Sequence, residues 1–166
     1  MKMDSMQRIM IVGCPGSGKS TFARALRDAM DLPLYYLDML YWNADRTTVS
    51  KDVFRERLEA VLAQEQWIID GNYGSTMERR MQACDTVFFL DYDTEICLEG
   101  IRTRRGKPRE DMPWIETDED AEFVQFVRDY QEVSRPKVLA LLEKYSDKQT
   151  IIFHSREEAE EYLAVF

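Results

Sequence analysis

A glycine-rich stretch, GCPGSGKST, occupies residues 13–21 and directly follows an apolar run at residues 9–12. Its Gly-x-x-x-x-Gly-Lys-Ser spacing is typical of a phosphate-binding loop, whose backbone N–H groups turn inward around a polyphosphate. The strand-like run before it and the amphipathic run at 22–30 favour this interpretation over a glycine-rich turn with an accidental lysine. The residues expected to bind nucleotide are Gly13, Gly16, Ser17, Gly18, Lys19, Ser20 and Thr21.

Within this loop, Lys19 and Ser20 are the residues with a chemical role. Lys19 is expected to contact the β- and γ-phosphates of ATP, where it acts catalytically, and the Ser20 hydroxyl is expected to join the Mg²⁺ shell. The partial positive charge of the following helix N-terminus adds to the attraction for phosphate. ATP and Mg²⁺ are therefore the expected cofactors.

Carboxylates follow three other strand-like runs, namely Asp38, Asp70 and Asp91. A single Asp at such a place often only caps a loop or helix. Three of them around a phosphate loop favour a role in handling Mg²⁺ and a phosphate acceptor. We expect Asp70 to hold water in the Mg²⁺ shell and Asp38 to orient or deprotonate an acceptor hydroxyl. Trp42 and Tyr73 are expected beside that acceptor.

A basic island at residues 102–109 stands out in an otherwise acidic chain. Phosphoryl transfer needs mobile positive charge that neutralises the transferring oxygens and excludes water. We therefore interpret residues 102–120 as a lid, in which Arg104 and Arg109 act catalytically. The alternative is a solvated helix end that offsets the helix macrodipole.

Composition limits the partners and the compartment. The chain has 166 residues, a formal net charge of -9 and 45% hydrophobic residues, so it should fold as one domain with a sizeable core. Its acidity makes direct nucleic-acid or anionic-membrane binding unexpected. We see no membrane span, no signal peptide in residues 1–5, and no disulfide or metal spacing among its three cysteines. A soluble, cytoplasmic protein, monomeric or dimeric, is expected.

Strand-like and helical patterns alternate along the chain. Strands are predicted at residues 8–12, 34–37, 67–70, 86–91 and 150–154. Helices are predicted after caps at Ser50, Thr94 and Ser155, after the acidic residues 116–120, and over 137–145 behind Pro136. Apolar strands that alternate with helices indicate an α/β fold with a parallel sheet covered on both faces.

With these residues the chain resembles the phosphate-loop kinases of the nucleoside monophosphate kinase group, adenylate kinase in particular. It is also similar to the adenylate-kinase-related bacterial proteins called DNA topology modulation proteins, through residues 37–42, 67–73 and 134–136. The resemblance covers nearly the whole chain. It implies a phosphate-loop NTPase three-layer sandwich with a five-stranded parallel sheet of order 2-3-1-4-5, a short lid and an acceptor-binding insertion at about 38–66.

Departures from adenylate kinase concern the acceptor. Tyr41 and Gly74 stand where the resemblance would place two arginines that hold the AMP phosphate, so AMP is expected to be a weak acceptor unless other arginines compensate. The arginines proposed for the acceptor are Arg79, Arg80 and Arg135, with Arg128 as an alternative to Arg135 in completing the lid.

The sequence thus predicts an ATP-dependent phosphotransferase that acts on a small acceptor, with a nucleoside or nucleotide as the first class to test. The alternative implied by the resemblance is a nucleotide-binding regulatory protein that affects DNA topology without small-molecule kinase activity. The absence of a basic helix or stripe outside the lid argues against direct contact with DNA.

Overall fold

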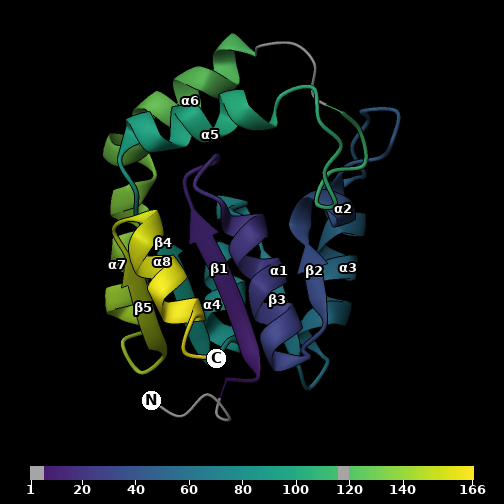
Figure 1. Ribbon diagram of the computed structural model, residues 1–166. Helices are drawn as coiled ribbons and strands as arrows, with labels where there is room; N and C mark the ends of the chain where they lie inside the picture. The colour runs from purple at the N-terminus through teal and green to yellow at the C-terminus, as the bar shows by residue number, and fades with distance from the viewer. Residues whose placement is uncertain (1–5, 116–119) are drawn as a thin grey trace.

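The computed structural model describes residues 6–115 and 120–166 (Figure 1). It contains a five-stranded parallel sheet of order β2-β3-β1-β4-β5, which confirms the predicted fold and strand order. The strands are β1 (Arg8–Gly13), β2 (Leu34–Tyr36), β3 (Trp67–Asp70), β4 (Thr86–Leu90) and β5 (Gln149–Phe153). Residues 1–5, where no signal peptide is expected, and residues 116–119 of the acidic helix entry predicted at 116–120 lie outside the described residues.

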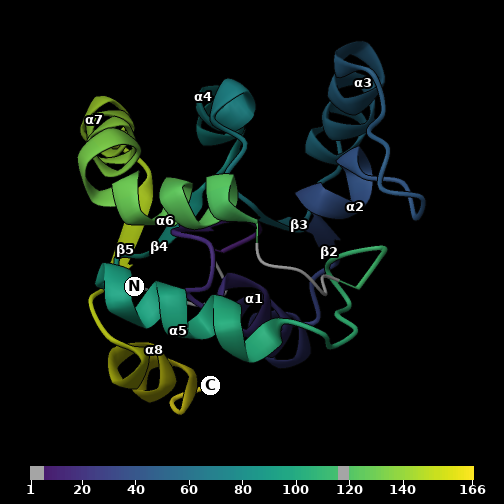
Figure 2. The ribbon, with the colours of Figure 1, turned by 90° about the horizontal axis from the view of Figure 1, so that it is seen from above.

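Helices cover both faces of the sheet. Figure 2 shows α1 and α8 on one face and α3, α4 and α7 on the other, while α5 and α6 cross above the carboxyl ends of the strands. The helices are α1 (Lys19–Met30), α2 (Leu37–Tyr41), α3 (Lys51–Leu62), α4 (Gly74–Ala83), α5 (Thr94–Arg104), α6 (Ala121–Val133), α7 (Arg135–Lys144) and α8 (Arg156–Leu163). Among the described residues, no helix is both long and apolar enough to span a bilayer.

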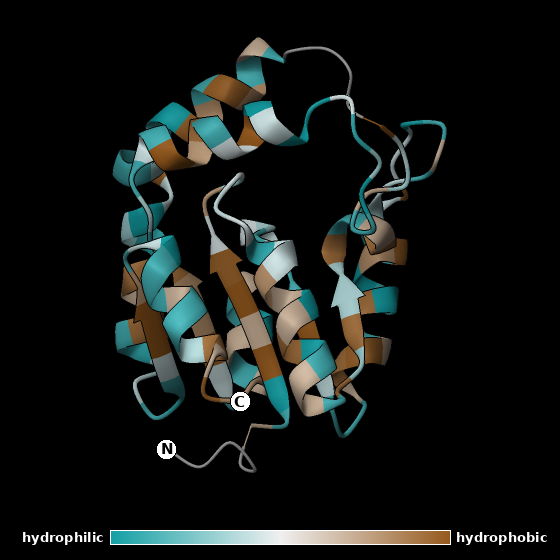
Figure 3. Cartoon of the chain, viewed as in Figure 1, coloured by the Kyte–Doolittle hydropathy of each residue, from teal (hydrophilic) through white to brown (hydrophobic). Residues whose placement is uncertain are grey.

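The central strands form the middle of the core, and the helices packed on both faces supply most of its other buried residues (Figure 3). Every residue of β3 and β4 is buried, as is β1 beyond Arg8. The outer strand β5 alternates between partly buried and exposed residues until Phe153. Continuous burial is what a parallel sheet with helices on both faces requires, and it leaves only the strand ends free for polar side chains.

Local signals set most helix starts. Ser50, Asp120 and Ser155 each accept a hydrogen bond from a backbone N–H in the first turn of α3, α6 and α8. Thr94, predicted to cap α5, is instead its first residue, with Asp93 at the cap position. Leu37, predicted as the end of the second strand, begins α2.

Helix α5 packs directly on the phosphate-binding loop. A Cβ added to Gly100 would lie 2.0 Å from the Gly16 carbonyl oxygen, and one added to Gly16 would lie 2.0 Å from the Cys97 carbonyl oxygen. Gly16 also has a φ of 87°, which L side chains rarely adopt. The two glycines therefore allow backbone-to-backbone contact between the loop and the helix that leads into the lid.

This contact gives a first testable prediction. Gly100→Ala should lower the free energy of unfolding by about 1–3 kcal/mol, because its methyl group overpacks against backbone that cannot move aside cheaply. It should also weaken nucleotide binding, since the oxygen it displaces belongs to the loop. Urea denaturation and ATP calorimetry measure the two effects.

Gly74→Ala is the matched control. Gly74 is the first residue of helix α4, and a Cβ added there would have no other atom within 4 Å. It should be neutral or slightly stabilising, because Ala has the higher helix propensity. Equal stability of the two variants would contradict the tight contact at Gly100.

Candidate active site

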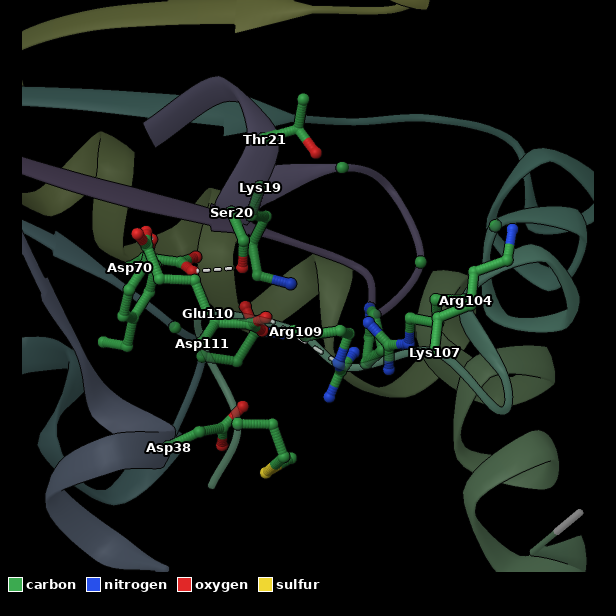
Figure 4. Close-up of a pocket in the computed structure, with 18 of the residues that line it drawn as sticks. Lys19, Ser20, Thr21, Asp38, Asp70, Arg104, Lys107, Arg109, Glu110 and Asp111 are labelled. Carbon is green, nitrogen blue, oxygen red and sulfur yellow. Dashed lines mark hydrogen bonds and ion pairs between the residues drawn. The ribbon is translucent and has the colours of Figure 1, made fainter. Parts of the chain in front are cut away.

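One large cavity lies at the carboxyl ends of the strands, with a volume of about 1250 Å³. The phosphate-binding loop forms one end, α5 and the described part of the lid form another wall, and the ends of β2 and β3 close the remainder. Figure 4 shows Lys19, Ser20, Asp38, Asp70, Arg104 and Arg109 around this space. Pockets for a single small ligand span roughly 300–1000 Å³, so the cavity has room for a nucleotide together with a small acceptor.

Two side chains that the sequence did not point to hydrogen-bond the backbone of the phosphate-binding loop. Asn72 accepts a hydrogen bond from the Gly13 N–H (3.2 Å) and donates one to the Gly13 carbonyl (2.7 Å). Arg156 donates to the carbonyls of Ser17 (2.9 Å) and Gly16 (3.1 Å). No local signal could have revealed these contacts, because Asn72 and Arg156 are 59 and about 140 residues away from the groups they bind.

Ser20 and Asp70 come together beneath the loop. The Ser20 hydroxyl donates to Asp70 Oδ2 at 2.6 Å, while Asp70 Oδ1 is buried and has no hydrogen-bond partner within residues 6–115 and 120–166. Burial raises the pKa of the Asp70 carboxyl to about 6, against the opposing effects of Lys19 and the Ser20 hydroxyl. A hydroxyl beside a carboxylate with one unsatisfied oxygen fits the inner and outer shell of a phosphate-bound Mg²⁺ ion.

Asp38 lies across the cavity, in the first turn of the short helix α2. Its Oδ1 accepts a hydrogen bond from the Tyr73 hydroxyl at 2.5 Å. Burial raises the pKa of the Asp38 carboxyl, and the negative charge of Asp111 acts in the same direction, whereas Tyr73 and Lys19 oppose the shift. A carboxylate with a raised pKa and a fixed orientation is suited to receive a proton.

Residues 104–109 contribute cations along the wall between these two ends. Arg104, Lys107 and Arg109 all line the cavity. The Arg104 guanidinium lies over the Phe123 ring, 5.8 Å from its centroid, and Arg109 is 3.7 Å from Asp111. The structure therefore brings Arg104 and Arg109 to the cavity that also contains Lys19, as Figure 4 shows.

The other predicted arginines lie elsewhere, and their expected placement is corrected. Arg79 pairs with the exposed Glu59. Arg80 is fully buried and donates to the backbone carbonyls of residues 71–73. Arg135 binds Asp91 through two nitrogens, and Arg128 is exposed on α6. None of the four lines the cavity, because each position on its helix faces a different neighbour.

Aromatic side chains form the wall beyond Asp38. Trp42 lies edge-to-face on Trp114, with ring centroids 5.9 Å apart, and Tyr41 contacts both Trp42 and Tyr73. The Arg46 guanidinium lies over the Trp114 ring, 4.7 Å from its centroid. Trp42 and Tyr73 are therefore at the cavity as predicted, whereas Trp114, from the segment after the lid arginines, was missed.

Of the predicted nucleotide-binding residues, Gly16, Gly18, Lys19, Ser20 and Thr21 line the cavity, whereas Gly13 and Ser17 are buried behind it. Cys14 is buried as well, and the pKa of its thiol is raised through its hydrogen bond with Cys97 and through burial. These features favour the interpretation of Cys14 as a small residue that fills the loop over that of a reactive thiol.

The sheet order and the phosphate-binding loop together define a phosphate-loop fold of the nucleoside monophosphate kinase-like kind. No protein-family model matches the chain. The chain is 27% identical over 115 residues to a shikimate kinase from Rhodococcus jostii (strain RHA1), a match that covers 61% of this chain and 68% of that relative.

Solved structures share the fold at lower identity. A shikimate kinase from Bacteroides thetaiotaomicron has a TM-score of 0.56 at 22% identity, covering 97% of this chain and 96% of its own. A shikimate kinase from Acinetobacter baumannii in complex with shikimate has a TM-score of 0.61 at 20% identity, covering 97% and 93%. These two structures show the fold, while the relative from Rhodococcus jostii supports an ATP-dependent small-molecule kinase and does not favour the DNA-topology alternative.

The buried Asp70 carboxyl gives a second testable prediction. Its pKa is higher in the folded protein, about 6, than in the unfolded chain, about 3.9, so the folded state binds the proton more tightly. Stability therefore falls as the pH rises from about 4 to 6, and the cost of the buried charge persists above that range. Asp70→Asn should raise the free energy of unfolding at pH 8 by about 2–3 kcal/mol in Mg²⁺-free buffer, with a smaller gain at pH 4.

Urea denaturation at the two pH values measures this effect, and Asp147→Asn, at an exposed carboxylate, is the control. The same Asp70→Asn variant should lose most of the Mg²⁺-dependent part of nucleotide binding in calorimetry. An Asp70→Asn variant that is no more stable than the parent at pH 8, or that binds nucleotide with an unchanged Mg²⁺ dependence, would contradict the assignment.

Proposed function

We propose that this protein transfers the γ-phosphoryl group of ATP to a hydroxyl group of a small acceptor that binds beside Asp38. The observation that carries the proposal is the arrangement within one cavity. The phosphate-binding loop with Lys19 lies at one end, the Asp38–Tyr73 pair lies at the other, and lid arginines line the wall between them. Residues 38–66 would then hold the acceptor and residues 102–120 would act as the lid.

At the nucleotide end, the loop residues bind the phosphates through backbone N–H groups, and Lys19 places a positive charge at the β- and γ-phosphates. Ser20 and Asp70 would hold Mg²⁺, Ser20 directly and Asp70 through water. When bound, the ion neutralises charge on the β- and γ-phosphate oxygens. Asn72 and Arg156 keep the loop in its binding shape by occupying its outward carbonyls.

At the acceptor end, the hydroxyl oxygen forms a bond to the γ-phosphorus while the bond from that phosphorus to the ADP oxygen breaks. The hydroxyl proton passes to the Asp38 carboxylate and from there to water. Tyr73 fixes the carboxylate through its hydrogen bond, which keeps one carboxylate oxygen directed at the acceptor. Arg104 and Arg109 would meet the charge that develops on the transferring group.

The likeness to shikimate kinases supports a hydroxyl acceptor and makes shikimate one compound to test. The proposal is tested by following ADP release from ATP and Mg²⁺ with a panel of nucleosides, monophosphates, polyols and shikimate. At least one acceptor should raise ADP release well above the rate with ATP alone. Lys19→Ala should weaken ATP binding and abolish this turnover, while Lys51→Ala, at an exposed lysine on α3, should leave both unchanged.

Two outcomes would contradict the proposed function. One is ATP binding that is as tight in Lys19→Ala as in the parent. The other is tight ATP binding by the parent without acceptor-dependent ADP release from any compound of the panel.

The role of Asp38 gives a separate prediction. Asp38→Asn keeps the size of the side chain and an oxygen for Tyr73, but it cannot take a proton. Transfer to a hydroxyl acceptor should fall by about 10²–10⁴-fold, while ATP affinity and thermal stability stay near those of the parent. Transfer to a monophosphate, whose oxygens are already ionised at neutral pH, should fall much less. Near-parental rates with both kinds of acceptor would show that Asp38 is not catalytic.

A further inference from the structure

The acceptor end of the cavity is rich in carboxylates. Asp38 and Asp111 both line it, and Asp111 is only 7% exposed. Each is close enough to other carboxylates to act on them, since Asp111 raises the pKa of both Asp38 and Asp70. An anionic group on the acceptor would be placed among these charges, in a partly buried site where screening by water is weak.

Cations near these carboxylates are already engaged. Arg46 stacks on Trp114 and donates to the Ile115 carbonyl at 3.4 Å. Arg24 donates to the Tyr36 hydroxyl at 3.4 Å and to the Thr21 hydroxyl at 3.3 Å. Lys19 and Arg109 lie toward the space for the transferring phosphate (Figure 4), where ATP itself would use their charge. Arg109 also pairs with Asp111 at 3.7 Å, so an ATP phosphate that draws on Arg109 would leave Asp111 less neutralised, and Asp38 and Asp111 would then face the acceptor.

The walls around this space are aromatic. Trp42, which follows α2, packs edge-to-face on Trp114, which follows Arg109 in the chain. Tyr41 and Phe54 extend this wall behind Tyr73, with ring centroids 5.2–5.3 Å apart. Aromatic walls with a few polar groups favour a ligand with a flat or apolar ring face.

We infer that the acceptor is an uncharged ring compound with a free hydroxyl group, of the nucleoside class, and that the site discriminates against acceptors with a phosphate or carboxylate. This inference rests on the proposed function, because it concerns the acceptor of that reaction. It sets the chain apart from its shikimate kinase relatives, since shikimate carries a carboxylate. The ring face binds the Trp42–Trp114 wall, and the hydroxyl group reaches Asp38.

Matched acceptor pairs that differ in charge test the inference. The pairs are thymidine and its 5′-monophosphate, adenosine and AMP, and shikimate methyl ester and shikimate. ADP release gives kcat/KM for each compound at saturating ATP and Mg²⁺. Thermal shift with a non-hydrolysable ATP analogue gives binding independently of turnover. In each pair that shows activity or binding, the uncharged member should be better by about tenfold or more, which corresponds to ~1.4 kcal/mol.

A substitution then tests whether the carboxylates cause the selectivity. Asp111→Asn removes one negative charge from the acceptor end, so the ratio of neutral to anionic acceptor should fall severalfold. Using a ratio within one variant cancels any change in overall rate from the loss of the Arg109 partner. Glu99→Gln removes a charge from the same cavity on α5, and it should leave the ratio unchanged.

A second variant tests the ring contact. Trp114→Leu should raise KM for a nucleoside several times more than KM for ATP, while Phe126→Leu, at an aromatic residue of the same cavity on α6, should change neither. The split between the two KM values separates loss of an acceptor contact from general damage to the fold.

The outcomes are separable from those of the proposed function. If ATP binds but no compound is phosphorylated, the proposed function fails, and the thermal-shift pairs still decide the charge selectivity. An anionic member that matches or exceeds its neutral partner would overturn the inference even if turnover is high. Failure of every uncharged ring compound to bind, or an unchanged ratio in Asp111→Asn, would also overturn it.

Discussion

The structure of the site depends on one constraint in the phosphate-binding loop. A loop that turns its N–H groups toward a phosphate leaves carbonyl oxygens on its outer side, and buried carbonyls need donors. Asn72 supplies one at Gly13, and Arg156 supplies two at Gly16 and Ser17. Asn72 lies just after β3 and Arg156 begins α8, so the binding shape of the loop depends on the assembled sheet and helix α8. Local sequence alone cannot hold it.

The same loop is connected to the lid through helix α5. Gly16 and Gly100 allow the backbone of the loop to touch the backbone of the helix that carries Arg104. A shift of α5 is therefore transmitted to the loop through rigid backbone, rather than absorbed by flexible side chains.

The cavity brings several charged side chains together at the carboxyl ends of the strands. Asp70 and Asp38 are carboxylates in buried or partly buried positions with raised pKa values, which costs stability when they are ionised. Buried carboxylates of this kind gather at functional sites more often than in structural cores. Arg80 is the contrasting case, since this fully buried cation holds three backbone carbonyls at the end of β3 and has a structural role. It positions the turn that carries Asn72 and Tyr73 to the cavity.

The sequence by itself determined the parts of this protein that are encoded over short stretches. Residues 13–21 identified the nucleotide end, apolar runs located all five strands to within one residue at each end, and the carboxylates after the strands pointed to Asp38 and Asp70. Only the tertiary structure decided which arginines line the cavity, because a helical position fixes a direction and not a partner. Three of the predicted arginines bind groups outside the cavity, namely Arg79, Arg80 and Arg135. Three residues that were not predicted lie at the site through contacts between segments far apart in the chain, namely Asn72, Trp114 and Arg156.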